Sequence, residues 1–148
     1  MSMFRRIAIG LCLIFLAPIV CSATIPPRKL LEIRSSDSGW ESDMAALDLL
    51  AKALGDEPES VGYIIVYAPR RARRNEVEKR RQCMKSYLLE RRGVGAERIK
   101  VVRGGYGEHA MIELWIVPPG ETASIPSPTV KPKDARLLRS RTKYHCQN

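Results

Sequence analysis

The chain has 148 residues, with 25 Lys or Arg against 16 Asp or Glu, so its formal net charge is +9. This length suits one domain with short appendages rather than two hydrophobic cores. The 45% share of hydrophobic residues excludes a wholly disordered chain, and no uncharged apolar run predicts an ordinary membrane span.

Residues 1–23 have the pattern of a secretory signal peptide. Two arginines precede an apolar stretch at residues 7–20, and small residues end the segment at Ala23. An uncleaved anchor helix is one alternative, but the apolar stretch is shorter than a bilayer requires. A lipoprotein acylated at Cys21 is another, and residues 18–20 lack the small residue usual before a modified cysteine. We therefore expect a periplasmic or secreted protein without a transmembrane span in its mature form.

Removal of residues 1–23 leaves two of the four cysteines, Cys83 and Cys146. In an oxidising compartment they favour one disulfide between the body of the domain and its C-terminal tail, which requires Cα atoms within about 7 Å. The alternative is two free thiols. His145 and Cys146 alone do not supply the four ligands of a zinc site, so we expect no metal and no cofactor.

The first half of the mature chain predicts a strand, a helix and a strand. A short apolar piece at residues 30–33 indicates an edge strand. Apolar residues then recur at three- and four-residue steps over residues 44–54, which predicts a helix with Asp43 as its N-cap. The apolar run at residues 61–68 predicts a strand that is buried on both faces and lies centrally in its sheet.

The second half predicts a longer helix and a pair of strands. Asn75 and Glu78 have the spacing of a capping box at the start of a helix that continues to Gly93. Its apolar stripe consists of Val77, Met84, Tyr87 and Leu88. Strands are expected at residues 98–103 and 111–117, joined by a turn at residues 104–107.

These elements predict an α/β fold: a two-layer sandwich in the order strand, helix, strand, helix, strand, strand, with a small mixed sheet. The expected organisation is a signal peptide at residues 1–23, a domain at residues 24–120, and a tail at residues 121–148. The tail begins as a Pro/Ser-rich linker without regular structure and becomes basic, with a helical turn expected at residues 135–138.

Nothing in the sequence predicts catalysis. The histidines are His109 and His145, and no Ser, Cys or acid pair stands close enough in sequence to His109 to form a catalytic set. The glycine-rich residues 104–107 precede a strand rather than a helix, so they do not form a nucleotide-binding loop. Glu113 faces the opposite side of its strand from Ile112 and is expected at the surface. We therefore expect no enzyme.

Positive charge is concentrated between residues 69 and 103, which contain 13 Lys or Arg against four acids. Four of these arginines directly precede the second helix: Arg70, Arg71, Arg73 and Arg74. Guanidinium groups beside the free N–H groups of a helix N-terminus favour a carboxylate or phosphate. The alternatives are a solvated basic surface without a ligand, and nucleic-acid binding, which an exported protein rarely needs.

Four short sequence stretches follow one another in a characteristic order along residues 47–108. They are residues 47–54 before the Pro58 turn, Glu78-Lys79-Arg80-Arg81 before Tyr87-Leu88, Gly93-Val94 before Glu97-Arg98-Ile99, and the turn at residues 105–108. Together they make residues 43–117, about half of the chain, resemble the OmpA-like domain of bacterial envelope proteins. The resemblance implies a non-catalytic domain that holds peptidoglycan by gripping diaminopimelate between an aspartate after the second strand and an arginine in the following helix.

The residues at the family's binding site match only in part. Arg80 aligns with the family's arginine. The family's Gly-His-Thr-Asp is replaced by Tyr67-Ala68-Pro69-Arg70, and its paired arginine near the last strand by Glu113-Leu114-Trp115-Ile116. A site that lacks the carboxylate and has additional arginines favours an anion over an ammonium group.

We therefore expect an exported, non-catalytic OmpA-like envelope module that binds an anionic group through a basic loop and helix. The predicted ligand-binding residues are Arg70, Arg71, Arg73, Arg74 and Arg80. The partner is a cell-wall or envelope component, such as peptidoglycan carboxylates, lipid phosphates or an acidic protein surface. The alternatives are a purely structural exported domain with a solvated basic face, and a nucleic-acid- or phosphate-binding protein.

Overall fold

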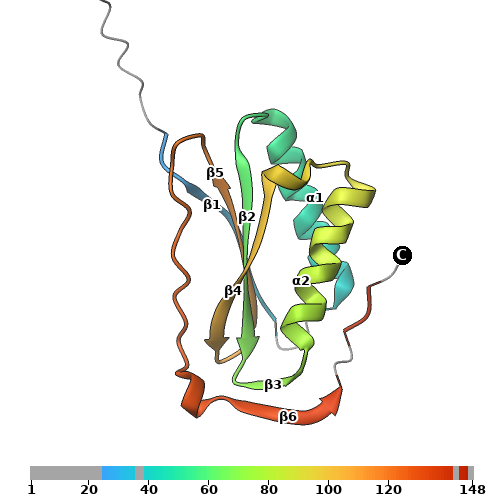
Figure 1. The fold of residues 1–148 in the computed structure, drawn as a ribbon, viewed down its shortest axis with the longest axis vertical. Coiled ribbons are helices and arrows are strands. Elements are labelled where there is room, and N and C mark those ends of the chain that lie inside the picture. The colour runs from blue at the N-terminus through green and yellow to red at the C-terminus, as the bar shows by residue number, and fades with distance from the viewer. Residues whose placement is uncertain (1–24, 36–38, 142–143, 147–148) are drawn as a thin grey trace, which may run out of the picture.

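The computed structural model describes residues 25–35, 39–141 and 144–146 (Figure 1). The predicted signal peptide at residues 1–23 lies outside the described residues. The elements are β1 (Arg28–Ser35), α1 (Trp40–Asp56), β2 (Val61–Pro69), β3 (Arg71–Arg74), α2 (Glu76–Ser86), β4 (Ile99–Gly107), β5 (Ala110–Val117) and β6 (Arg136–Arg141). A π-helical turn, Tyr87–Arg91, extends α2, and short 3₁₀ turns lie at Ala96–Arg98 and Pro132–Asp134.

The main sheet confirms the predicted α/β sandwich. Its strand order is β1-β5-β2-β4, with β2 parallel to β4 and β5 antiparallel to both of its neighbours. The helices α1 and α2 cover one face (Figure 1). As predicted, β1 is an edge strand and β2 an inner one. The core between the layers contains Leu47, Leu50, Leu54, Ile64, Val66, Met84, Leu88, Ile112, Leu114 and Ile116.

The basic tail forms a strand, not the helical turn expected at residues 135–138. Strand β6 pairs in parallel with β3, and Arg71 stands opposite Arg136. The backbone N–H of Arg136 donates to the carbonyl of Arg70 at 2.7 Å. Through this pairing, backbone N–H and C=O groups of the two short segments form hydrogen bonds with each other instead of with water. The two-stranded ribbon crosses one end of the molecule (Figure 1).

The segment that precedes β6 packs against the main sheet rather than extending as a free linker. The Tyr67 hydroxyl, on the sheet face opposite the helices, accepts a hydrogen bond from the Ser127 N–H at 3.0 Å. Val130 is buried and forms an isolated bridge with Tyr106. Because the segment covers this face, Tyr67 is also buried, and β2 is enclosed on both sides as its apolar sequence predicts.

Glu113 is buried, contrary to the expectation of a surface carboxylate. Glu113 is only 8% exposed. Its carboxylate accepts hydrogen bonds from Lys29 Nζ and from Trp115 Nε1, each at 3.1 Å. These partners compensate for the loss of water around a charged group.

Helix α1 begins earlier than predicted, whereas α2 begins directly after Asn75 as predicted but without the expected capping hydrogen bonds. The N-cap of α1 is Gly39, and Asp43 lies inside the helix. Asn75 precedes α2 in the left-handed conformation, with φ 61°, and its side chain makes no capping hydrogen bond. The first-turn carboxylate that binds backbone is Glu76, which accepts from the Arg73 N–H at 2.9 Å. The predicted capping box with Glu78 is therefore absent.

Gly104 lies within β4, although a turn was expected at residues 104–107. The pairing of β2 with β4 shifts at this point. A Cβ atom on Gly104 would lie 2.5 Å from the Tyr67 ring and 2.7 Å from Ile65 Cγ2. Gly104 therefore allows the Tyr67 ring to lie against the strand, and the reversal comes after Gly107.

We predict that Gly104→Ala lowers the free energy of unfolding by about 1–3 kcal/mol, because the added methyl group overpacks the Tyr67 contact. Chemical denaturation measures the change. The control is Gly55→Ala in α1, where an added Cβ meets nothing within 4 Å, and which should leave stability unchanged or raise it. Equal stability of the Gly104→Ala variant and the parent would contradict the packing argument.

Candidate functional site

A groove lies where β3, β4 and the start of α2 meet. It has a volume of about 350 Å³. Its lining includes Arg73 and Arg74 from β3, Arg103 from β4, and apolar side chains that include Val77 and Leu137. The groove therefore combines guanidinium groups with an apolar wall, at the N-terminal end of α2.

The four arginines of the basic loop divide between two depressions. Arg73 and Arg74 line the groove. Arg70 and Arg71 line a separate hollow together with Glu108 and His109, and Arg70 lies 3.6 Å from the Glu108 carboxylate. The loop therefore does not direct all of its cations toward one ligand.

Carboxylates neutralise part of the positive charge in the groove. Glu78 accepts hydrogen bonds from Arg103 at 2.7 Å and from Arg81 at 2.8 Å. The Arg103 hydrogen bond is the main reason that the pKa of Glu78 lies below its usual value. Within the described residues, no acidic side chain lies within ion-pair distance of Arg73 or Arg74. Glu76 also lines the groove but accepts a hydrogen bond from the Arg73 backbone, so these two guanidinium groups are cations of the groove without an ion pair.

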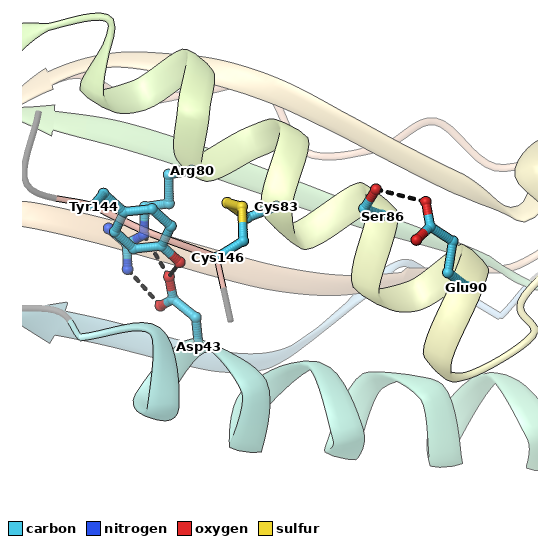
Figure 2. Close-up of a disulfide and its surroundings, with 7 residues drawn as sticks. All are labelled: Asp43, Arg80, Cys83, Ser86, Glu90, Tyr144 and Cys146. Carbon is cyan, nitrogen blue, oxygen red and sulfur yellow. Dashed lines mark hydrogen bonds and ion pairs between the residues drawn. A yellow bond between two sulfur atoms is a disulfide. The ribbon is translucent and has the colours of Figure 1, made fainter. Parts of the chain in front are cut away.

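Arg80 does not join the other predicted anion-binding residues. Its side chain is 4% exposed and pairs with Asp43, which is fully buried. Arg80 Nε and Nη2 donate to the two carboxylate oxygens at 2.7 and 2.6 Å (Figure 2). The helical turn of α2 directs Arg80 toward α1, away from the groove, so a solvent anion does not reach it in this structure.

Tyr144, from the C-terminal tail, completes this buried cluster. Its hydroxyl donates to Asp43 at 2.5 Å, and its ring centre lies 5.9 Å from the guanidinium carbon of Arg80 (Figure 2). Burial, with the nearby Asp43 carboxylate, raises the pKa of Tyr144 well above its usual value, so the hydroxyl remains protonated. The ring of Trp40 meets the ring of Tyr144 edge to face at 6.0 Å.

A disulfide joins Cys83 of α2 to Cys146, which confirms the predicted pairing. The two Cα atoms are 5.5 Å apart, within the range that a disulfide requires. The bond lies beside the Asp43 and Arg80 pair (Figure 2). It fixes the end of the tail to α2, and such bonds are typical of proteins in oxidising compartments.

Sequence reasoning missed three partners in these arrangements. Asp43 was interpreted as a cap, Arg103 was counted only among the cations of residues 69–103, and Tyr144 was not considered. The burial of Asp43 on the same helix face as Leu47 and Leu50 is a signal that helical periodicity could have provided. No comparable signal identifies Tyr144, because its position depends on the path of the tail.

Among the described residues, no group of three or more His, Cys, Asp and Glu side chains is arranged to hold a metal ion. No helix in the described ranges has the length and apolar character needed to cross a bilayer.

No family model matches the chain, and no curated protein matches it either. The resemblance to OmpA-like domains therefore stays a prediction from the sequence motifs.

We predict that Arg80→Leu lowers the free energy of unfolding by about 3–5 kcal/mol, because it leaves the Asp43 carboxylate buried without its cation. Urea denaturation measures the loss. The matched control is Arg92→Leu, which breaks the exposed ion pair with Asp48 and should lower stability far less, because solvent screens that pair. Similar losses of stability in the two variants would contradict the argument that burial makes the Asp43–Arg80 pair more stabilising than an exposed pair.

We also predict that Cys146→Ser lowers the free energy of unfolding by about 2–5 kcal/mol, because the disulfide closes a long loop in the unfolded chain. The bond spans 63 residues. Mass spectrometry under nonreducing conditions should detect the peptide that contains both Cys83 and Cys146. Reductant should destabilise the parent but not the variant, and two alkylatable thiols in the exported parent would contradict the pairing.

Proposed function

We propose that this protein is an exported, non-catalytic envelope module of the OmpA-like type that binds an anionic group of a cell-wall or membrane component. The binding site is the groove between β3, β4 and α2. Arg73 and Arg74 are its principal ligands, and Arg71 adds positive charge on the neighbouring surface.

The observation that carries this proposal is that Arg73 and Arg74 line the groove without an ion-pair partner among the described residues. Glu76 and Glu78 occupy the first turn of α2, as the helix dipole favours, but the two arginines that precede the helix gain nothing from that dipole. The arginine fork suits the paired oxygens of a carboxylate or phosphate. The groove volume of about 350 Å³ is at the lower end of the range of about 300–1,000 Å³ for small-ligand sites.

The buried cluster supports an anion rather than the ammonium group that the family resemblance implies. Arg80, which aligns with the family's arginine, already has its carboxylate partner in Asp43. Tyr144 occupies the remaining side of that pair. Arg80, which aligned with the family's arginine, therefore stabilises the fold, while Arg73 and Arg74 line the groove without an ion-pair partner.

The disulfide supports the exported location. Cys83 and Cys146 are joined, and a structural disulfide persists where the environment is oxidising. This fits the signal-peptide pattern at residues 1–23 and a location in the periplasm or outside the cell.

The test is retention of the exported protein on a crude envelope fraction that contains both wall and membrane, at low and high salt. We expect retention at low salt that weakens as salt rises, because exposed charges are screened. The Arg73→Gln/Arg74→Gln double variant should lose at least about tenfold in affinity, since each charge-assisted contact contributes about 1.5–3 kcal/mol.

The control is Lys52→Gln, which removes an exposed cation from α1, away from the groove. It should bind the envelope fraction like the parent protein. Failure of the parent to bind at low salt would remove the proposal. Unchanged binding by the double variant would favour the alternative of a structural domain with a solvated basic face.

A further inference from the structure

The C-terminal tail contributes a second cationic depression beside the groove. It has a volume of about 350 Å³ and is lined by Arg74, Leu137, Leu138 and Arg139. We refer to these four residues as the tail patch. Arg74 comes from β3 and the others from β6, so the patch exists only because the tail pairs with the basic loop.

The tail patch differs from the groove in its charge. Glu76 and Glu78 line the groove, whereas no acidic residue lines the tail patch. Neither Arg74 nor Arg139 has an acidic side chain within ion-pair distance among the described residues. The patch thus holds two cations and no counter-charge of its own. The patch is therefore complementary to a negatively charged partner.

The tail patch also contains two apolar side chains, Leu137 and Leu138. Leu137 is 61% exposed and lines both the tail patch and the groove. Leu138, beside it, is half-buried. A leucine flanked by arginines matches a partner that presents an anion next to a hydrocarbon. Carbohydrate and phosphate polymers of the wall supply the anion but no hydrocarbon to cover Leu137.

We propose that the tail patch docks this protein on an anionic phospholipid surface. Arg74 and Arg139 pair with lipid phosphates, and Leu137 enters the boundary between headgroups and acyl chains, as apolar residues of surface-bound proteins do. This inference rests on the proposed function, since Arg74 serves both sites, and it identifies the membrane as the envelope component that is bound.

The tail is held firmly enough to present this surface. At one end Val130 is buried against the main sheet, and at the other Tyr144 and Cys146 are fixed to α1 and α2. The ribbon between these points lies across one end of the molecule (Figure 1). A surface fixed in advance loses little conformational freedom on binding.

The experiment measures binding of the exported, disulfide-bonded protein to vesicles by cosedimentation. The vesicles contain either phosphatidylcholine alone or equimolar phosphatidylcholine and phosphatidylglycerol. We expect binding to the anionic vesicles alone. Arg139→Gln should lower the affinity for the anionic vesicles about fivefold, which is the contribution expected of one cation near an anionic surface. Leu137→Ser should weaken it by at least a similar factor, and its effect should persist at high salt because burial of hydrocarbon is not screened.

Matched controls distinguish this site from general surface effects. Lys52→Gln removes an exposed cation from α1, and Leu49→Ser removes a leucine of α1 that is 42% exposed. Both should bind anionic vesicles like the parent. Equal losses in Leu49→Ser and Leu137→Ser, or no loss in either tail variant, would overturn the assignment to the tail patch.

Parallel binding to lipid-free wall material separates the two proposals. Retention on the wall without binding to anionic vesicles would overturn the lipid inference and leave the proposed function standing. Equal binding to both kinds of vesicle would also overturn it, because lipid charge would then have no role. Binding to neither vesicles nor wall material at low salt would contradict both proposals.

Discussion

The buried ion pair between Asp43 and Arg80 is the interaction on which the arrangement of helices and tail depends. Charges without water require nearly complete pairing. The Asp43 carboxylate receives two N–H groups from Arg80 and the hydroxyl of Tyr144. These donors come from α2 and from the tail, so the pair stabilises the fold only when α1, α2 and the tail are all in place.

The position of the tail then determines the basic surface. The disulfide at Cys146 fixes one end of the tail beside α2, and the burial of Val130 fixes the other. Between these two points, β6 crosses the end of the sheet and pairs with the backbone of β3. A loop that is basic in sequence thus becomes half of a ribbon that is basic on both strands. The two cations of the tail patch, which holds no counter-charge of its own, are the physical reason to expect an anionic partner.

Local patterns predicted the main elements because burial acts on residues that are close in sequence. The three- and four-residue spacing of Leu47, Leu50 and Leu54 reflects one helix face, and the continuous apolar run of β2 reflects its enclosure on both sides. The errors came where a partner lies far away along the chain. Glu113 is buried with Lys29 as its partner, and strand β4 continues through Gly104 because the missing side chain leaves room for the Tyr67 ring of β2.

For this protein, hydrophobic periodicity was sufficient to predict the α/β sandwich. The two cysteines that remain after removal of residues 1–23 only favoured a pairing of Cys83 with Cys146, which the folded chain confirms. The roles of its arginines were not accessible in that way. Arg74 and Arg80 are six positions apart in one basic stretch, yet Arg74 is exposed at the groove and Arg80 is buried between α1 and α2. The difference arises because burial of an arginine depends on whether a distant carboxylate meets it, and only the folded chain brings Asp43 and Tyr144 to Arg80.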